Sequence, residues 1–273
     1  MKIEVLKSQV GDNYFYLIHD DVVAALVDPV DGAQAVREVQ ARGLALKWIL
    51  NTHFHPDHVS GNPMVLRAFP ETNVVAGAGD ADAIEAQFDA RGERGVDWRV
   101  HAGDEVELGG ERFRVLETPG HTAGHVSFLL GRHLFSGDVV FTGGAGNCRF
   151  GGEPGSLYET FRDVLGPLPE DTAFYPGHDY AVNNAEFVLS IEPEQKEALA
   201  VLEEARKHRD AGELFQSTLG RERKYNPFMR YDEEALIGRL ERLHSDRLEE
   251  MRARSADDGE AVFRCLRSLR DEW

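Results

Sequence analysis

The stretch Thr52-His53-Phe54-His55-Pro56-Asp57-His58 places three imidazoles and one carboxylate within six positions, directly after an apolar run. His53 and His55 alternate in extended backbone, so both side chains can point to one place, while Asp57 and His58 follow where the chain turns toward a helix. Imidazole nitrogen and carboxylate oxygen are the ligands that zinc and similar divalent metals take. Four such ligands exceed what one open catalytic site usually draws from a single loop. The stretch therefore predicts two metal ions.

Three more candidate ligands lie downstream, each directly after a glycine at the end of an apolar, strand-like run. They are His121 after Thr118-Pro119-Gly120, Asp138 after Phe135-Ser136-Gly137, and His178 after Tyr175-Pro176-Gly177. Glycine permits the sharp turn that presents one side chain at a strand end. A single His is more often a hydrogen-bonded core or surface residue than a ligand. The conjunction of three such positions with the first cluster reverses that expectation.

Length and composition indicate an enzyme rather than a nucleic-acid-binding protein. The chain has 273 residues, 42% of them hydrophobic, which predicts one large domain and a smaller one. A formal net charge of -18 argues against a surface that covers phosphate backbones. The sequence has no long apolar run and no signal-peptide pattern, so we expect a soluble cytoplasmic protein with no membrane partner. Its two cysteines, Cys148 and Cys265, lack CxxC spacing, and we expect both to be reduced thiols. No protein partner is expected.

Hydrophobic patterning predicts an α/β fold followed by helices. A helical segment at 33–41 leads to a buried strand at 45–50 that delivers the histidine cluster, and strand and helix patterns then alternate to about residue 175. Beyond His178 only helical patterns follow, so we expect a catalytic domain at 1–180 and a smaller helical domain at 181–273. The spacing of Leu236, Leu240, Leu243 and Met251 predicts one apolar face on a helix.

In these motifs the chain resembles the metallo-β-lactamase superfamily, whose His-x-His-x-Asp-His signature and later His, Asp and His are matched in order. Within it the chain is most similar to the glyoxalase II family, the hydroxyacylglutathione hydrolases, from about residue 1 to 230 and again from 263. The resemblance implies an αβ/βα sandwich with a helical C-terminal domain. It further implies that His53, His55 and His121 hold one metal, that Asp57, His58 and His178 hold the other, and that Asp138 bridges them.

The same resemblance implies four substrate contacts. Tyr225-Asn226-Pro227-Phe228-Met229-Arg230 is similar to the family's Asn-Pro-Phe segment, and 263–271 to its terminal helix, in which two basic residues contact the glycine carboxylate of glutathione. Arg267 and Arg270 take those positions, and their i, i+3 spacing puts them on one helix face. Tyr180 and Arg149 match further substrate contacts, but Gly151 stands where the family has an aromatic residue, so the thiol could differ from glutathione.

These observations predict a binuclear metal-dependent thioesterase that converts S-(2-hydroxyacyl)glutathione and water to a 2-hydroxy acid and glutathione. Two divalent ions, zinc or alternatively iron or manganese, would supply hydroxide and stabilise the oxyanion, with Asp57 and Asp138 as the catalytic carboxylates. The alternatives are a persulfide dioxygenase-like oxidoreductase with one iron, a hydrolase of another thioester or ester, and a non-catalytic binding protein. His125 could extend the ligand set, but by the same resemblance it supports the ligands instead.

Overall fold

The structure is a computed structural model that describes residues 1–89 and 92–273. It divides into two compact units. The first comprises residues 1–118, 122–138 and 175–178, and the second comprises residues 119–121, 139–174 and 179–273. The division follows spatial contacts rather than chain order, because the chain passes between the two units several times.

The first unit contains a six-stranded mixed sheet in the order β1-β2-β3-β4-β5-β6. The first three strands pair antiparallel, and the pairs from β3 to β6 are parallel. The histidine cluster follows β4, which the sequence predicted as a buried strand. The strands are β1 (Lys2–Lys7), β2 (Tyr14–His19), β3 (Val23–Val27), β4 (Ala45–Asn51), β5 (Asn73–Gly77) and β6 (Trp98–Val100).

A second sheet of five strands has the order β13-β10-β9-β8-β7. The pairs from β7 to β10 are antiparallel hairpin neighbours. Strand β13 crosses the boundary of the units, and its last two residues, Tyr175 and Pro176, belong to the first unit. The strands are β7 (Glu105–Leu108), β8 (Glu111–Glu117), β9 (Val126–Leu130), β10 (His133–Gly137) and β13 (Ala173–Pro176).

Strand β2 shows why the two sheets form a sandwich. All six of its residues are buried, as expected of a strand covered on both faces. Phe15 and Leu17 join the core formed with helices α1 and α3, whereas the ring of Tyr16 meets Phe135 of β10 at 5.5 Å between centroids. Alternate residues of one strand thus fill the layer under the helices and the layer between the sheets. The predicted αβ/βα sandwich is confirmed.

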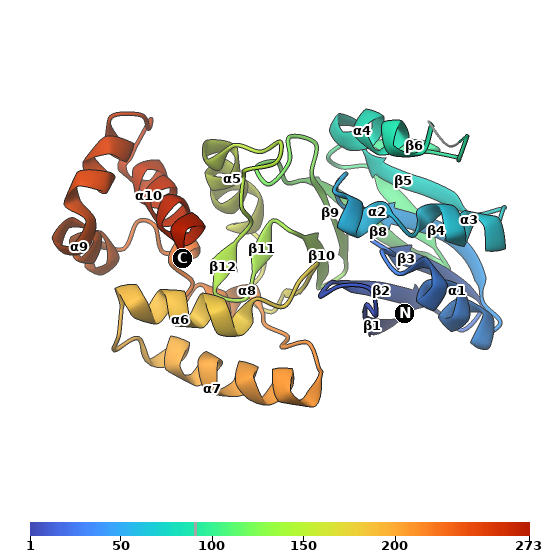
Figure 1. The fold of residues 1–273 in the computed structure, drawn as a ribbon, viewed down its shortest axis with the longest axis horizontal. Coiled ribbons are helices and arrows are strands. Elements are labelled where there is room, and N and C mark those ends of the chain that lie inside the picture. The colour runs from blue at the N-terminus through green and yellow to red at the C-terminus, as the bar shows by residue number, and fades with distance from the viewer. Residues whose placement is uncertain (90–91) are drawn as a thin grey trace. The chain divides into compact units, whose positions relative to one another are not determined.

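Four helices belong to the first unit: α1 (Gly32–Ala41), α2 (Pro56–Val59), α3 (Asn62–Ala68) and α4 (Ala78–Asp89). Helix α1 confirms the helical segment predicted at 33–41. It begins at Asp31, whose side chain accepts a hydrogen bond from the backbone N–H of Gln34. Helices α1 and α3 contact each other beside the six-stranded sheet (Figure 1).

The second unit is mainly helical, as predicted for the C-terminal part of the chain. Helices α6 and α7 lie side by side, as do α9 and α10 (Figure 1). In the described part of the chain no helix combines the length and the apolar character needed to cross a membrane. The elements are β11 (Val140–Phe141), β12 (Gly144–Ala145), α5 (Pro154–Glu159), the π-helical turn η1 (Thr160–Leu165), α6 (Ala181–Ile191), α7 (Lys196–Ala211), α8 (Leu219–Glu222), the 3-10 turn η2 (Pro227–Met229), α9 (Glu234–Arg252) and α10 (Asp258–Glu272).

Helix α9 differs from the prediction at one position. Leu236 and Leu240 are fully buried, but Leu243 is 47% exposed. The helix is interrupted at the next residue, His244, whose φ of -142° and ψ of 36° are not helical and rotate the turns that follow. Leu248 is buried after this kink. The predicted apolar face through Leu243 is therefore wrong, because burial on this face ends at Leu240 and resumes only beyond the kink.

Candidate metal centre and substrate groups

The histidine-rich stretch divides into two pairs of side chains at the start of α2. Pro56 occupies the first turn of this helix, where its fixed φ and missing N–H are tolerated. His53 and His55 precede the turn, and Nε2 of His53 lies 3.0 Å from Nδ1 of His55. Asp57 and His58 lie within the helix. The start of α2 at Pro56 thus separates the two pairs along the chain.

His178 and Asp138 join the second pair. The donor atoms of Asp57, His58 and His178 all lie within 4.8 Å of one another. Nε2 of His178 is 3.3 Å from Oδ2 of Asp57 and 3.5 Å from Oδ2 of Asp138. The other oxygen of Asp138, Oδ1, is 3.5 Å from Nε2 of His58. Four candidate ligands from three separate segments of the chain therefore converge on one small volume.

The two pairs are adjacent, and two glycines make room for them. The rings of His53 and His58 are 4.1 Å apart between centroids. Gly137, directly before Asp138, has a φ of +48°, a conformation that side chains other than glycine rarely adopt. A Cβ atom at Gly177 would lie 2.4 Å from both Oδ1 of Asp138 and Cε1 of His58. Gly177 is thus required for close approach, and Gly137 for its dihedral angle.

Asp28 and Asn13 support this cluster, although the sequence indicated neither. Asp28 accepts hydrogen bonds from the backbone N–H and the hydroxyl of Thr52 at 2.8 and 2.6 Å, and it lies 3.0 Å from Nδ1 of His58. An Nδ1–H donated to Asp28 leaves Nε2 of His58 as the metal-binding atom. The side-chain amide of Asn13 donates to the backbone carbonyl and to Oδ2 of Asp57.

The electrostatics of the cluster favour a bound cation. Burial lowers the pKa of His58, but Asp138 and Asp28 outweigh burial and raise this pKa well above its usual value. Burial likewise lowers the pKa of His178, and Asp138 reverses the effect and raises it to about 10. Burial raises the pKa of Asp138, yet the two histidines hold it well below its usual range. Buried carboxylates held ionised in this way require positive charge nearby, and the His and Asp donors fit a divalent metal.

His121 belongs to a short segment of the second unit. Its Nδ1 lies 2.6 Å from the backbone carbonyl of Asn147, to which it can donate, so that Nε2 is the atom suited to a metal. Gly120 has a φ of +137°, which gives the turn expected before the ligand. Thr118 and Thr122, on either side of the segment, both belong to the first unit. His121 is therefore tethered at both ends to the unit that carries the other six candidate ligands.

His125 supports a ligand rather than adding one. Its Nε2 accepts a hydrogen bond from the backbone N–H of Asp138 at 3.3 Å, and its Nδ1 lies 2.8 Å from the hydroxyl of Thr118. Its ring stacks on that of His53, with centroids 5.1 Å apart. Both ring nitrogens have protein partners, so His125 orients Asp138 and packs against His53.

Two of the four predicted substrate groups, Arg149 and Arg267, meet at Asp271 in the second unit. Arg149 is exposed and donates to the backbone carbonyl of Asp271, and its Nε lies 3.7 Å from the Asp271 carboxylate. Arg267 is only 4% exposed. It donates to the carbonyls of Ala145 and Gly146 at 2.6 and 3.1 Å and to Asp271 at 2.9 Å. Arg267, on α10, thus holds β12 in place through hydrogen bonds to backbone carbonyls, a role that its sequence position did not indicate.

Arg270, on α10, reaches the start of α6, which Tyr180 directly precedes. Arg270 donates through Nε to the side-chain oxygen of Asn184 at 3.0 Å and through Nη2 to that of Asn183. Burial lowers the pKa of Arg270, and the neighbouring charge of Arg267 acts in the same direction. Tyr180 packs edge to face on Phe141, with centroids 5.1 Å apart. Arg270 is less buried than Arg267, so it is the better placed of the two to contact a ligand.

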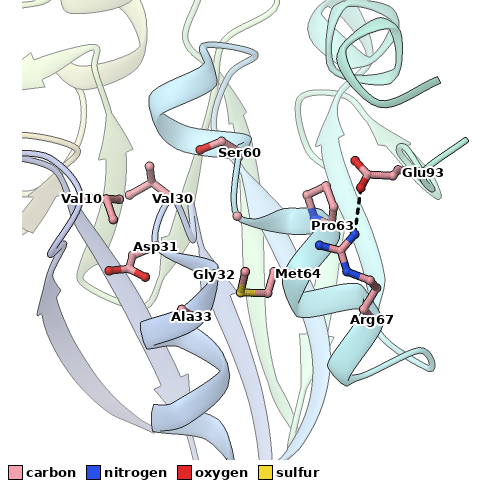
Figure 2. A pocket seen from close by; sticks show the side chains of 11 residues that line it. Val10, Val30, Asp31, Gly32, Ala33, Ser60, Pro63, Met64, Arg67 and Glu93 are labelled. Carbon is pink, nitrogen blue, oxygen red and sulfur yellow. Dashed lines mark hydrogen bonds and ion pairs between the residues drawn. The ribbon is translucent and has the colours of Figure 1, made fainter. Parts of the chain in front are cut away.

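A separate pocket in the first unit lies apart from this chemistry (Figure 2). Its volume is about 250 Å³, and an ion pair of 2.9 Å between Arg67 and Glu93 forms part of its wall. Among the described residues that line it, none is a predicted ligand or substrate contact. They are Val10, Val30, Asp31, Gly32, Ala33, Ser60, Gly61, Pro63, Met64, Arg67 and Glu93.

Comparison with known proteins agrees with this arrangement. Residues 9–178 match the metallo-beta-lactamase superfamily, and residues 179–273 match the hydroxyacylglutathione hydrolase C-terminus. The fold is thus that of a metallo-β-lactamase-type protein. Within that class, the chain belongs to the hydroxyacylglutathione hydrolase family.

The relatives behind this assignment match over nearly the whole chain. A hydroxyacylglutathione hydrolase of Nitrosococcus oceani is 36% identical over 96% of this chain and 94% of its own length. That of Anaeromyxobacter dehalogenans is 38% identical over 95% of both chains. Among solved structures, ETHE1 from Myxococcus xanthus has a TM-score of 0.63 at 30% identity, covering 89% of this chain and 92% of that one. The BLEG-1 B3 metallo-beta-lactamase, at 22% identity, has a TM-score of 0.64 over 84% of this chain and 99% of that one and shares the fold.

Proposed function

We propose that this protein is a hydroxyacylglutathione hydrolase, a metal-dependent thioesterase that converts S-(2-hydroxyacyl)glutathione and water to a 2-hydroxy acid and glutathione. The observation that carries the proposal is the convergence of Asp57, His58, Asp138 and His178 beside His53 and His55 in one unit. A relative named hydroxyacylglutathione hydrolase matches over 96% of this chain, and residues 179–273 match the C-terminal region of that family.

The proposed centre holds two divalent metals. His53, His55 and His121 would hold one, and Asp57, His58 and His178 the other, with Asp138 as the bridging ligand. Zinc suits these nitrogen and oxygen donors, and iron and manganese accept them as well. When bound, such a pair ionises water near neutral pH and polarises a carbonyl group.

The chain's own residues prepare this chemistry. Asp28 and the Asn147 carbonyl accept the Nδ1 protons of His58 and His121, so each of these imidazoles presents Nε2 to the centre. Asn13 holds the carboxylate of Asp57 in place. Asp57 and Asp138 supply negative charge that attracts a divalent cation, and metal binding would release the protons that carboxylates favour on His58 and His178. The thiolate of a thioester leaves without prior protonation, so a side-chain general acid is not required.

We propose that residues 1–180 form the catalytic domain and residues 181–273 the substrate-binding domain. Arg270, with Tyr180 and Arg149, would bind the glutathione part of the substrate. Arg267 would contribute its charge and hold β12, which its hydrogen bonds to Ala145 and Gly146 already restrain. A cytoplasmic location agrees with the free thiols of Cys148 and Cys265.

The test combines metal analysis of the purified protein with an assay of S-lactoylglutathione hydrolysis. We expect two metal ions per chain and release of glutathione with the loss of the thioester. One iron ion, together with oxygen uptake on a persulfide of glutathione, would instead support the oxidoreductase alternative. Hydrolysis of thioesters of other thiols at equal kcat/KM would retain the thioesterase but reject glutathione as the specific thiol.

A further inference from the structure

Asp80 connects two loops that carry predicted metal ligands. It lies in the first turn of α4, and only 3% of it is exposed. Its carboxylate accepts three hydrogen bonds: from the backbone N–H of Phe54 at 3.2 Å, from the hydroxyl of Thr122 at 2.6 Å and from the backbone N–H of Gly124 at 2.9 Å. Phe54 stands between His53 and His55, and Thr122 directly follows His121. Asp80 and its three partners all belong to the first unit.

Glycines bring the start of α4 and the 122–124 loop unusually close together. A Cβ atom on Gly124 would lie 2.2 Å from the backbone nitrogen of Asp80, and one on Gly79 would lie 2.7 Å from Cα of Gly124. A Cβ atom on Gly77 would lie 2.4 Å from the carbonyl oxygen of Gly124. Real side chains cannot occupy such space, so the two backbones meet only because glycine stands at all three positions. The contact is what brings the Asp80 carboxylate within reach of the 122–124 loop.

We propose that Asp80 is a positioning residue for one of the two metals. By accepting the N–H of Phe54 it fixes the backbone between His53 and His55, and by accepting from Thr122 and Gly124 it fixes the residues that follow His121. It would thereby set the separation of these three imidazoles before a metal binds. The inference rests on the proposed metal centre and adds a residue that touches neither metal nor substrate.

The other set of ligands has a different carboxylate behind it, which makes the inference selective. Asp28 lies 3.0 Å from Nδ1 of His58 and holds Thr52. Asp80 has no hydrogen bond to His58, Asp138 or His178 among those the structure describes. Loss of Asp80 should therefore weaken one metal much more than the other, whereas general damage to the fold would weaken both.

The experiment measures the affinity of the full chain for Zn²⁺ in the Asp80→Ala variant, by competition with a chromophoric chelator and by metal analysis. The matched control is Asp31→Ala. Asp31 belongs to the same unit, is similarly buried at 5% exposed, and accepts two backbone N–H groups, from Gln34 and Gln9, neither of which adjoins a predicted ligand in the sequence. It lines the separate pocket (Figure 2). Its loss removes a helix cap and should lower the melting temperature.

We expect the wild type to bind two ions and Asp80→Ala to bind one of them about 10- to 100-fold more weakly, the range typical of residues that orient metal ligands. The second ion should stay within about threefold of wild type, and Asp31→Ala should keep both within that limit. Equal affinity for both ions in Asp80→Ala and wild type, or parallel losses in Asp80→Ala and Asp31→Ala, would overturn the inference. A wild type that binds no Zn²⁺ would instead overturn the metal centre itself.

If Asp80→Ala does not fold, Asp80→Asn decides the question. Asparagine keeps one acceptor oxygen, but its amide must face the N–H of either Phe54 or Gly124, so one of those two hydrogen bonds is lost. Its selective loss of affinity should be smaller than that of Asp80→Ala but measurable, at several-fold. Wild-type affinity for both ions in Asp80→Asn would likewise overturn the proposal.

Discussion

Glu222 offers a sharp test of how the second unit holds the hairpin formed by β11 and β12. The residue is fully buried, and its two oxygens accept four hydrogen bonds. Oε1 accepts from the hydroxyls of Ser217 and Tyr225 at 2.6 and 2.9 Å. Oε2 accepts from the backbone N–H of Gly143 at 2.7 Å and from the side-chain amide of Asn226 at 3.0 Å. The hairpin and the helical region thus meet at one carboxylate.

The Glu222→Ala substitution should be strongly destabilising. It leaves four buried donors without their acceptor, of which the two hydroxyls can rotate toward other partners. The N–H groups of Gly143 and Asn226 cannot, and each unpaired buried donor costs about 1 to 3 kcal/mol. The free energy of unfolding should therefore fall by roughly 2 to 6 kcal/mol, a large part of the ~5 to 15 kcal/mol that stabilises a typical domain.

Glu222→Gln is the matched control because the four donors are arranged in two unlike pairs. The glutamine oxygen can accept from Gly143 and Asn226, and its amide can donate to the hydroxyls of Ser217 and Tyr225, which are able to accept. All four contacts then persist without a buried charge. At neutral pH we expect Glu222→Gln to remain within about 1 kcal/mol of wild type.

The same residue predicts a pH dependence. Burial raises the pKa of Glu222 above its usual value, although its four hydrogen bonds act in the opposite direction. As pH rises above that usual value, the unfolded chain ionises first while the folded protein keeps its proton, so the wild type loses stability. The loss continues up to the raised pKa and has a slope of at most about 1.4 kcal/mol per pH unit. The stability of wild type relative to Glu222→Gln should therefore decline as pH increases.

Urea unfolding followed by circular dichroism at several pH values measures the free energy of unfolding of wild type, Glu222→Ala and Glu222→Gln, and how it depends on pH. Metal content should be recorded in parallel, because bound metal also stabilises the folded state. A loss below 1 kcal/mol in Glu222→Ala, or equal losses in the alanine and glutamine variants, would refute the reasoning that four buried donors depend on this carboxylate.

Three further outcomes are expected. Asp138→Ala should lose metal and activity together, because its two oxygens lie beside His58 and His178; a variant with two tightly bound ions and most of its turnover would contradict the binuclear proposal. Gly177→Ala should reduce the amount of bound metal without changing the secondary structure, because its Cβ would lie 2.4 Å from atoms of two predicted ligands. Metal analysis and circular dichroism measure the two quantities, and full metal occupancy would show that the loop adjusts to the side chain. Arg270→Ala should raise KM for a glutathione thioester far more than it lowers kcat, and it should not change the kinetic constants for a small thioester that lacks the glycine carboxylate. Equal losses of kcat/KM on both substrates would instead show that Arg270 supports folding through its hydrogen bond to Asn184.

Much of the fold was predictable because local patterns carry it. The pattern at 45–50 predicted a buried strand, which is β4, and the helical pattern at 33–41 predicted α1. The turn toward a helix was predicted at Asp57 and His58, which lie in α2, and the positive φ angles of Gly120 and Gly137 agree with the turns predicted before His121 and Asp138. These features depend on dihedral preferences and on periodicity within a few residues, and both follow from the types of neighbouring residues in the sequence.

The tertiary structure alone decided which polar groups satisfy one another. Asp28 meets His58 from 30 positions away, and Asp80 meets Thr122 and Gly124 across more than 40 positions. Arg267 has the spacing of an exposed ligand contact, yet it is buried against the carbonyl groups of β12. A side chain's donors and acceptors are visible in the sequence, but their partners depend on which distant segments the packed core brings together. The ligand types therefore follow from the sequence, whereas their orientation and support follow from the fold.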